Sequence, residues 1–229
     1  MAGNADALRS VIADAASGVA LALRGGGGPD AVSGILHPDN PFAPAAVRVL
    51  GADVLAPYAL GHPPPTAEAG DAQSVRMALA AYPPGADASE VSVWSYGGLA
   101  EAARRFLPAD GALPPVPDAD MAWTGTDPWQ RLAHRVSQLA ALAVPGLADG
   151  LAANLAPRVD DLSRGFVRAV RRRDWLQAAG VGRWLARLPD VPETLGLDTG
   201  LVFVGRLGAA DPRVDLHVAA AQRFFGRGR

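Results

Sequence analysis

Neither cysteine nor lysine occurs among the 229 residues of this chain. The absence of cysteine excludes disulfides, thiolate nucleophiles, cysteine-ligated zinc and iron–sulfur clusters. The absence of lysine excludes Schiff-base catalysis and the phosphate loop that ends in Gly-Lys-Ser or Gly-Lys-Thr. We therefore interpret the glycine run at residues 25–28 as a turn or a flexible linker, and we predict that the protein uses no cofactor.

Histidine is also scarce, and none of the four has the spacing of a helical metal site, so we predict no bound metal. His37 lies in the segment HPDN, where Asp39 could orient it as a general base; a histidine beside a turn is the alternative. His134 precedes Arg135 on a polar helix face, which is either part of a site or simply solvated. Together with Tyr96, these four side chains form our set of candidate catalytic residues.

Long apolar runs are missing, since none reaches the roughly 18 residues that cross a bilayer. The first ten residues, MAGNADALRS, also lack the basic-then-apolar pattern of a secretory signal. Hydrophobic residues make up 49% of the chain, which is typical of a globular protein. We therefore predict a cytoplasmic protein without a membrane partner. The excess of Ala, Gly, Pro and Arg without lysine suggests a GC-rich source, such as an actinobacterium.

The net charge of −2 conceals two halves of opposite sign. Residues 1–127 carry 14 acidic and 6 basic side chains, which gives −8, whereas residues 128–229 carry 9 acidic and 15 basic ones, which gives +6. Electrostatic attraction between the two halves is one interpretation of this split. Binding of an acidic partner by the basic half is the other.

The first part of the chain, residues 1–107, is predicted to mix helices and strands. One or two strands are expected within residues 47–60, and another over residues 89–98 (SEVSVWSYGG), where β-branched and polar residues alternate. Trp94 and Tyr96 would share one face of that strand, where they either line a small-molecule pocket or pack on the helices. The predicted fold class is thus α+β with a short sheet.

The second part, residues 121–229, is predicted to be mainly α-helical, and the Pro- and Asp-rich residues 108–120 form a linker before it. Apolar residues recur there at helical spacing. In the first of these helices they are Trp129, Leu132, Val136, Leu139 and Leu142. Asp211 followed by Pro212 is typical of the start of a helix.

Three consecutive arginines, Arg171–Arg173, precede Asp174 and Trp175. Asp174 and Gln177 have the spacing of a helix cap, so the arginines are predicted to occupy the last turn of the preceding helix, where its dipole favours cations. The alternative is a clamp for a phosphate, a nucleic acid or an acidic partner. The candidate partner-binding residues are Trp94, Arg168, Arg171, Arg172, Arg173 and Trp175.

Three functions remain open at this point. The first is a non-catalytic accessory or binding protein that recognises a peptide or partner protein of an actinobacterial biosynthetic pathway. The second is a cofactor-independent enzyme of the cyclase or isomerase type that acts on a small natural product. The third is nucleic-acid binding by residues 158–187, which hold eight arginines and three acidic residues; it is disfavoured because the isoelectric point is near 6.1.

Overall fold

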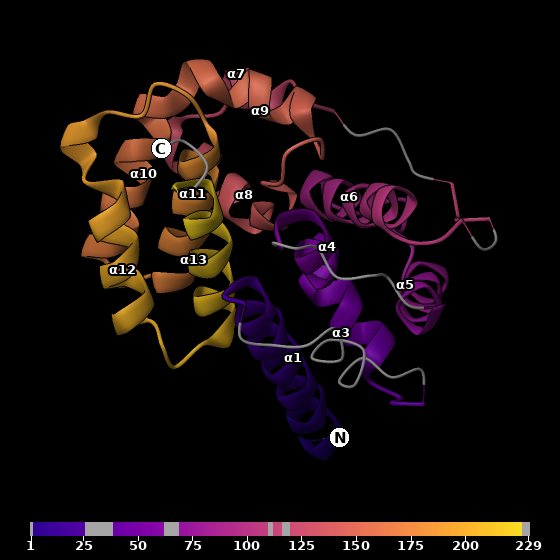
Figure 1. The fold of residues 1–229 in the computed structure, drawn as a ribbon. Helices are drawn as coiled ribbons and strands as arrows, with labels where there is room; N and C mark the ends of the chain where they lie inside the picture. Colours follow the sequence, from indigo (N-terminus) through magenta and orange to yellow (C-terminus); the bar gives the residue numbers. More distant parts are fainter. Residues whose placement is uncertain (1, 26–38, 62–68, 110–111, 116–119, 226–229) are drawn as a thin grey trace. The chain divides into compact units, whose positions relative to one another are not determined.

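The computed structural model describes residues 2–25, 39–61, 69–109, 112–115 and 120–225 (Figure 1). Of these described residues, 76% are helical. Across the same ranges there is no strand or sheet, and the only extended pairing is an isolated bridge between Val144 and Leu147. The predicted α+β fold is therefore wrong, and the protein is all-α in the part that the structure describes.

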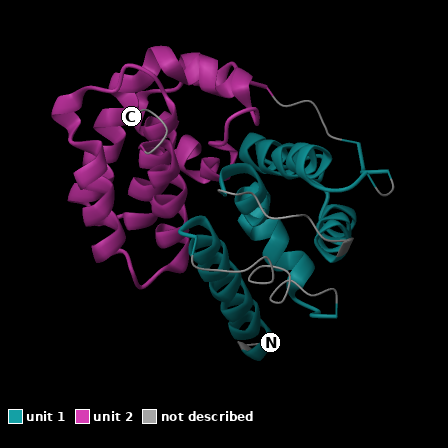
Figure 2. Cartoon of the chain, viewed as in Figure 1, with its two compact units in different colours: residues 1–119 teal, residues 120–229 magenta. Residues whose placement is uncertain are grey.

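The chain divides into two compact units, which are coloured separately in Figure 2. Unit 1 is Met1–Ala119 and unit 2 is Asp120–Arg229. The prediction that the Pro- and Asp-rich residues 108–120 form a linker between the two parts of the chain stays a prediction.

Unit 1 is built from helices that enclose an aliphatic core. They are α1 (Ala2–Leu23), α3 (Ala43–Leu50), the 3₁₀ helix η1 (Gly51–Leu55), α4 (Ala56–Leu60), α5 (Ala69–Ala81) and α6 (Glu90–Phe106). Helix α3 packs on α1 and α5, and α6 packs on η1. Side chains that are almost fully buried in this unit include Val19, Leu23, Val47, Leu55, Leu79 and Leu99. Alternation of small and large apolar residues lets these short helices approach one another closely.

The strand predicted over residues 89–98 is instead the first half of α6. Ser89 caps this helix, because its side chain accepts a hydrogen bond from the Ser92 backbone N–H at 3.3 Å. The buried positions then follow helical spacing, with Tyr96, Leu99 and Ala103 on the inner face. β-branched residues lower helix propensity by only a few tenths of a kcal/mol, which burial of this face outweighs.

The strands predicted within residues 47–60 are also wrong, since these residues belong to α3, η1 and α4. The stretch Ala43–Leu60 has a mean hydropathy of 1.2 and is 67% buried within the structure. By length and composition alone it could span a membrane, which our sequence analysis did not recognise. A buried core segment has the same composition, so this is only weak evidence for a membrane, and the cytoplasmic location stays a prediction.

Unit 2 is a bundle in which one helix lies at the centre. Its helices are α7 (Trp123–Thr126), α8 (Trp129–Gln138), η2 (Ala140–Leu142), α9 (Asp149–Leu155), η3 (Ala156–Arg158), α10 (Val159–Arg171), α11 (Trp175–Arg187), η4 (Glu193–Leu195), α12 (Leu197–Leu207) and α13 (Pro212–Phe225). Helix α11 packs against α8, α10, α12 and α13. All of its residues from 178 to 185 are buried, as expected of a helix surrounded by others.

Close packing and backbone anchors hold α11 in place. A Cβ atom at Gly180 would lie 2.7 Å from the Ser137 carbonyl oxygen, so only glycine permits this approach to α8. The Trp184 indole N–H donates to the Leu139 carbonyl at 3.2 Å. The Arg187 guanidinium donates to the Leu142 and Leu147 carbonyls at 3.1 and 3.0 Å, and it pairs with Asp149. Burial lowers the pKa of Arg187, the nearby Asp149 opposes this, and Arg183 lowers it further.

The arginine triplet lies at the junction of α10 and α11. The predicted cap is confirmed, because the Asp174 carboxylate accepts from the Gln177 backbone N–H at 3.2 Å. The predicted place of the arginines is confirmed only for Arg171, since Arg172 caps α10 and Arg173 lies beyond it in the left-handed conformation, with φ +59°. The backbone N–H groups of Arg173 and Asp174 donate to the Val170 and Ala169 carbonyls, which is the Schellman arrangement.

Candidate functional site

An open groove lined by arginines lies on the surface of unit 2, with a volume of about 670 Å³. We call it the arginine groove. It is formed by α8, α10 and η4, and its lining residues are Trp129, Ser163, Arg164, Val167, Arg168, Arg171, Arg172 and Leu195. The arginine side chains surround a mainly apolar surface, so the groove offers both positive charge and an apolar contact area.

The arginines of this groove share one face of α10 because of their spacing. Arg164, Arg168 and Arg171 follow one another at intervals of four and three residues, whereas the opposite face carries buried residues such as Leu162 and Phe166. The arrangement follows from the amphipathic pattern of the helix. Packing of the apolar face on α8 and α11 turns the arginines toward solvent.

Few acidic side chains neutralise these cations. Arg164 lies 3.5 Å from Asp161, in an exposed pair that contributes at most about 1 kcal/mol. The Arg168 guanidinium lies 5.6 Å from the centre of the Trp129 ring, a cation–π contact. Arg171 and Arg172 are exposed, and within the described residues neither makes an ion pair. The groove is thus a source of positive potential with available hydrogen-bond donors.

A buried hydroxyl group adds a polar atom to the groove wall. The Ser163 Oγ atom is inaccessible to solvent and has no hydrogen-bond partner among the described residues. Most buried polar atoms in proteins are hydrogen-bonded, and an unsatisfied one costs about 1–3 kcal/mol. Because this atom is inaccessible, a ligand in the groove does not reach it in this structure.

A second, smaller pocket adjoins the groove, and we call it the polar pocket. It has a volume of about 190 Å³ and is lined by Trp129, Gln130, Ala133, His134, Gly165, Arg168, Ala169, Arg172, Asp174 and Gln177. Trp129, Arg168 and Arg172 line both cavities, so the two lie next to each other. The smaller one brings amides, an imidazole and a carboxylate close to two of the arginines.

A glycine in α10 brings α8 close enough to form this pair of cavities. A Cβ atom at Gly165 would lie 2.3 Å from the Cβ atom of Ala133, far inside van der Waals contact. Only glycine therefore permits the observed separation of the two helices. This separation places Trp129, in the first turn of α8, beside Arg168 of α10.

The candidate catalytic residues of the first half lie in unit 1 or outside the described residues. His37 is not described, and Asp39 is exposed just before α3. The Tyr96 hydroxyl donates to the Leu79 carbonyl at 3.1 Å, and the Arg48 guanidinium lies 5.7 Å from its ring centre. Burial raises the pKa of Tyr96, and the charge of Arg48 partly opposes this. The hydroxyl therefore holds α5 and α6 together.

The other two candidate catalytic residues lie on α8. His134 is exposed and lines the polar pocket. Arg135 lies 3.3 Å from Asp127 and 5.5 Å from the centre of the Trp123 ring, so it stabilises the start of unit 2. Over the described part of the chain, no three His, Asp or Glu side chains are grouped so as to hold a metal ion.

The candidate partner-binding residues are divided between different surroundings. Arg168, Arg171 and Arg172 line the arginine groove, whereas Arg173 lines neither cavity. The Trp175 ring packs edge-on against Phe203 of α12, with ring centres 6.0 Å apart. Trp94 is partly buried on α6 of unit 1 and does not share a strand face with Tyr96, because the segment is helical.

Sequence reasoning missed the other residues of the groove. Arg164 had a detectable signal, since it precedes Arg168 by one helical turn. Trp129 was recognised only as part of an apolar helix face, and Leu195 had no signal at all. Both belong to segments far from α10 in sequence, so their place beside the arginines depends on how the helices pack.

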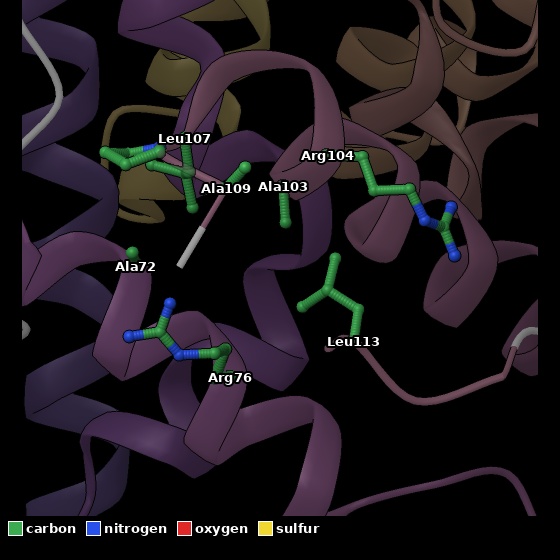
Figure 3. Close-up of a pocket in the computed structure, with 8 residues that line it drawn as sticks. Ala72, Arg76, Ala103, Arg104, Leu107, Ala109 and Leu113 are labelled. Atoms are coloured by element: carbon green, nitrogen blue, oxygen red, sulfur yellow. The ribbon is translucent and has the colours of Figure 1, made fainter. Parts of the chain in front are cut away.

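Unit 1 has a pocket of its own, with a volume of about 270 Å³ (Figure 3). Its walls are Ala72, Arg76, Ala103, Arg104, Leu107, Pro108, Ala109 and Leu113. Figure 3 shows Arg76 and Arg104 on opposite sides of it. Arg104 already pairs with Glu101 at 2.8 Å, and the volume lies just below the range of about 300–1,000 Å³ that ligand pockets usually have. The arginine groove is therefore the stronger candidate site.

Comparison of the chain with models of protein families, with curated proteins and with solved structures finds no match, so the site is interpreted from its own geometry and chemistry.

Proposed function

We propose that unit 2 is a non-catalytic binding unit that recognises an acidic segment of a peptide or partner protein in the arginine groove. The observation that carries this proposal is the set of four arginines around one open groove, two of which make no ion pair among the described residues. Arginine suits this role because its planar guanidinium can donate two parallel hydrogen bonds to one carboxylate.

The overall charge of unit 2 supports an acidic partner. Residues 120–229 contain 15 arginines and 11 acidic residues, which gives a net charge of +4. Long-range attraction of this kind raises the rate at which an oppositely charged partner associates. Because the groove is open to solvent, that attraction weakens with added salt.

Nucleic-acid binding is the less favoured alternative because several arginines of residues 158–187 have structural roles. Arg158 pairs with Asp161 at 2.7 Å and donates to the Thr124 and Asp127 carbonyls. Arg183 is fully buried, and Arg187 anchors backbone carbonyls as described above. The stripe of eight arginines is thus not one continuous basic surface.

The enzymatic alternative has less support from the described residues. The Tyr96 hydroxyl is already bonded to a backbone carbonyl, and Arg135 is paired with Asp127. His134 remains as the imidazole beside the groove. The Asp174 carboxylate lines the same pocket, but it accepts a hydrogen bond from the Gln177 backbone N–H, so it and His134 form no defined general acid–base pair.

The proposal is tested by the affinity of the full-length chain for a fluorescent acidic peptide. We expect binding that weakens steeply between low and physiological salt. Replacement of both free arginines, R171Q together with R172Q, should weaken it by about tenfold or more, since each charge-assisted hydrogen bond contributes about 1.5–3 kcal/mol. The matched control is R206Q, which removes an exposed arginine of α12 that lines neither cavity.

Two results would contradict the proposal. The first is an acidic peptide that fails to bind or that binds the double variant as tightly as the unaltered chain. The second is tighter binding of single-stranded DNA than of the acidic peptide under the same salt conditions, which would favour nucleic acid instead.

A further inference from the structure

We infer that the arginine groove and the polar pocket together form one two-part site for a peptide segment in which a carboxylate side chain lies within two residues of a large apolar one. This inference rests on the proposed function and specifies the partner further. Three residues, Trp129, Arg168 and Arg172, line both cavities. The two cavities therefore adjoin, and a peptide segment that passes over these shared residues can reach both.

The polar pocket has the charge and the donors for a single carboxylate. Arg168 and Arg172 contribute two positive charges, and Asp174 contributes one negative charge, which leaves +1. Asp174 stays in place because it caps α11. The side-chain amides of Gln130 and Gln177 line the same pocket and can donate to a bound oxygen. A carboxylate, with one negative charge, balances this set of groups.

The same charge balance disfavours a phosphate group. A phosphomonoester carries about −1.5 to −2 at neutral pH, so it would leave excess negative charge next to Asp174. Like charges at short range are costly in a partly enclosed pocket. The pocket should therefore select a carboxylate side chain over a phosphorylated one.

The arginine groove offers an apolar surface for the neighbouring side chain. Val167 is 36% exposed on α10, and Leu195 and Trp129 stand beside it in the lining. The arginine stems extend this apolar floor while their charged ends remain in solvent.

The spacing of side chains along an extended peptide matches a site with one polar and one apolar cavity. In an extended segment, side chains two residues apart point to the same side and are separated by roughly 6.5–7 Å. Two such side chains can enter two adjacent cavities from one backbone. The observed site thus predicts a short motif with one acidic and one apolar residue, in place of a uniformly acidic tail.

The test uses the full-length chain and three fluorescent peptides of equal length. The first contains aspartates separated by glycine and serine, the second has one leucine two residues from an aspartate, and the third replaces that aspartate with phosphoserine. We expect the second peptide to bind about tenfold more tightly than the first, because burial of a leucine side chain contributes that much or more. The third should bind more weakly than the second.

Two matched variants test whether the leucine side chain binds in the arginine groove. V167T adds a hydroxyl to the floor of the groove and should remove most of the tenfold advantage of the leucine peptide. V202T makes the same change on α12, where Val202 is 37% exposed and lines neither cavity, and should leave that advantage intact.

The outcomes separate this inference from the proposed function. If the leucine peptide and the aspartate peptide bind equally, or V167T and V202T act alike, the two-part site is wrong while acidic recognition stands. Preference for the phosphoserine peptide would overturn the assignment of a carboxylate to the polar pocket. If none of the peptides binds, both the inference and the proposed function fail.

Discussion

The Nη1 atom of Arg183 lies 3.3 Å from the Nδ1 atom of His217, and the arginine is fully buried. A guanidinium group has donors only, so Nδ1 is the acceptor in this contact. This contact joins the central helix α11 to α13.

Loss of the acceptor at His217 should destabilise the protein. H217F removes the partner of the buried guanidinium, and we expect the free energy of unfolding to fall by about 1–3 kcal/mol. H217N places an amide oxygen close to the former Nδ1 position and should lose less. Urea unfolding of the full-length chain followed by circular dichroism measures both. Equal losses for the two variants would show that the acceptor is not what matters.

The start of α13 should contribute stability that depends on pH. Burial raises the pKa of Asp211, but hydrogen bonds from the Arg213 side chain and backbone outweigh this and lower it below the ordinary value. The folded protein therefore binds this proton less readily than the unfolded chain. The resulting stabilisation is present above the unfolded pKa of about 3.9 and is lost as the pH falls through the lower folded value.

The variant D211N tests this contribution because asparagine still caps a helix but carries no charge. At pH 7 we expect it to be less stable by about 0.5 kcal/mol, the scale of a half-exposed ion pair. The difference should close as the pH falls below about 4. Urea unfolding at several pH values measures it, and a difference that persists unchanged at pH 3 would assign it to something other than ionisation.

The close approach of α8 and α10 at Gly165 should tolerate no side chain. A Cβ atom there would clash with Ala133, so G165A should destabilise the protein by about 1–3 kcal/mol and weaken peptide binding by displacing Trp129. Gly205 of α12 is the control, since a Cβ atom there would meet Val218 at 3.5 Å, an ordinary contact. G205A should stabilise its helix by about 0.5–1 kcal/mol. Thermal unfolding compares the two.

Arg173 should be replaceable by glycine at a gain in stability. Its φ of +59° is unfavourable for any residue with a Cβ atom, by about 1–2 kcal/mol. Glycine loses more backbone entropy on folding, so we expect R173G to stabilise the protein by about 0.5–1 kcal/mol. Because Arg173 lines neither cavity, peptide affinity should hardly change. A loss of affinity equal to that of R172Q would place Arg173 in the site.

The sequence was informative about unit 2 and misleading about unit 1. Apolar spacing predicted α8, α10 and α11, and the Asp174 cap was confirmed because capping depends on residues close in sequence. The strand predicted at residues 89–98 failed for a physical reason. Alternating Ser and Val residues favour a strand locally, but the burial of Tyr96 and Leu99 at helical spacing decided the outcome.

The candidate site was predictable only in its local part. Arg168, Arg171 and Arg172 could be placed on one helix end from their order in the chain. The sequence did not predict which arginines have a structural role and which could bind a ligand. Arg183 and Arg187 differ from Arg171 only in the residues that pack around them. That packing depends on contacts between residues far apart in the sequence.

The junction between α10 and α11 has a consequence for how the groove would take up a ligand. The Schellman turn and the Asp174 cap share adjacent residues, so the backbone that carries Arg171 and Arg172 is held by hydrogen bonds on both sides. Association then needs to order little more than the long arginine side chains, at about 0.5–1.5 kcal/mol for each one immobilised. The groove is thus preorganised, and changes in affinity among ligands should appear mainly in their dissociation rates.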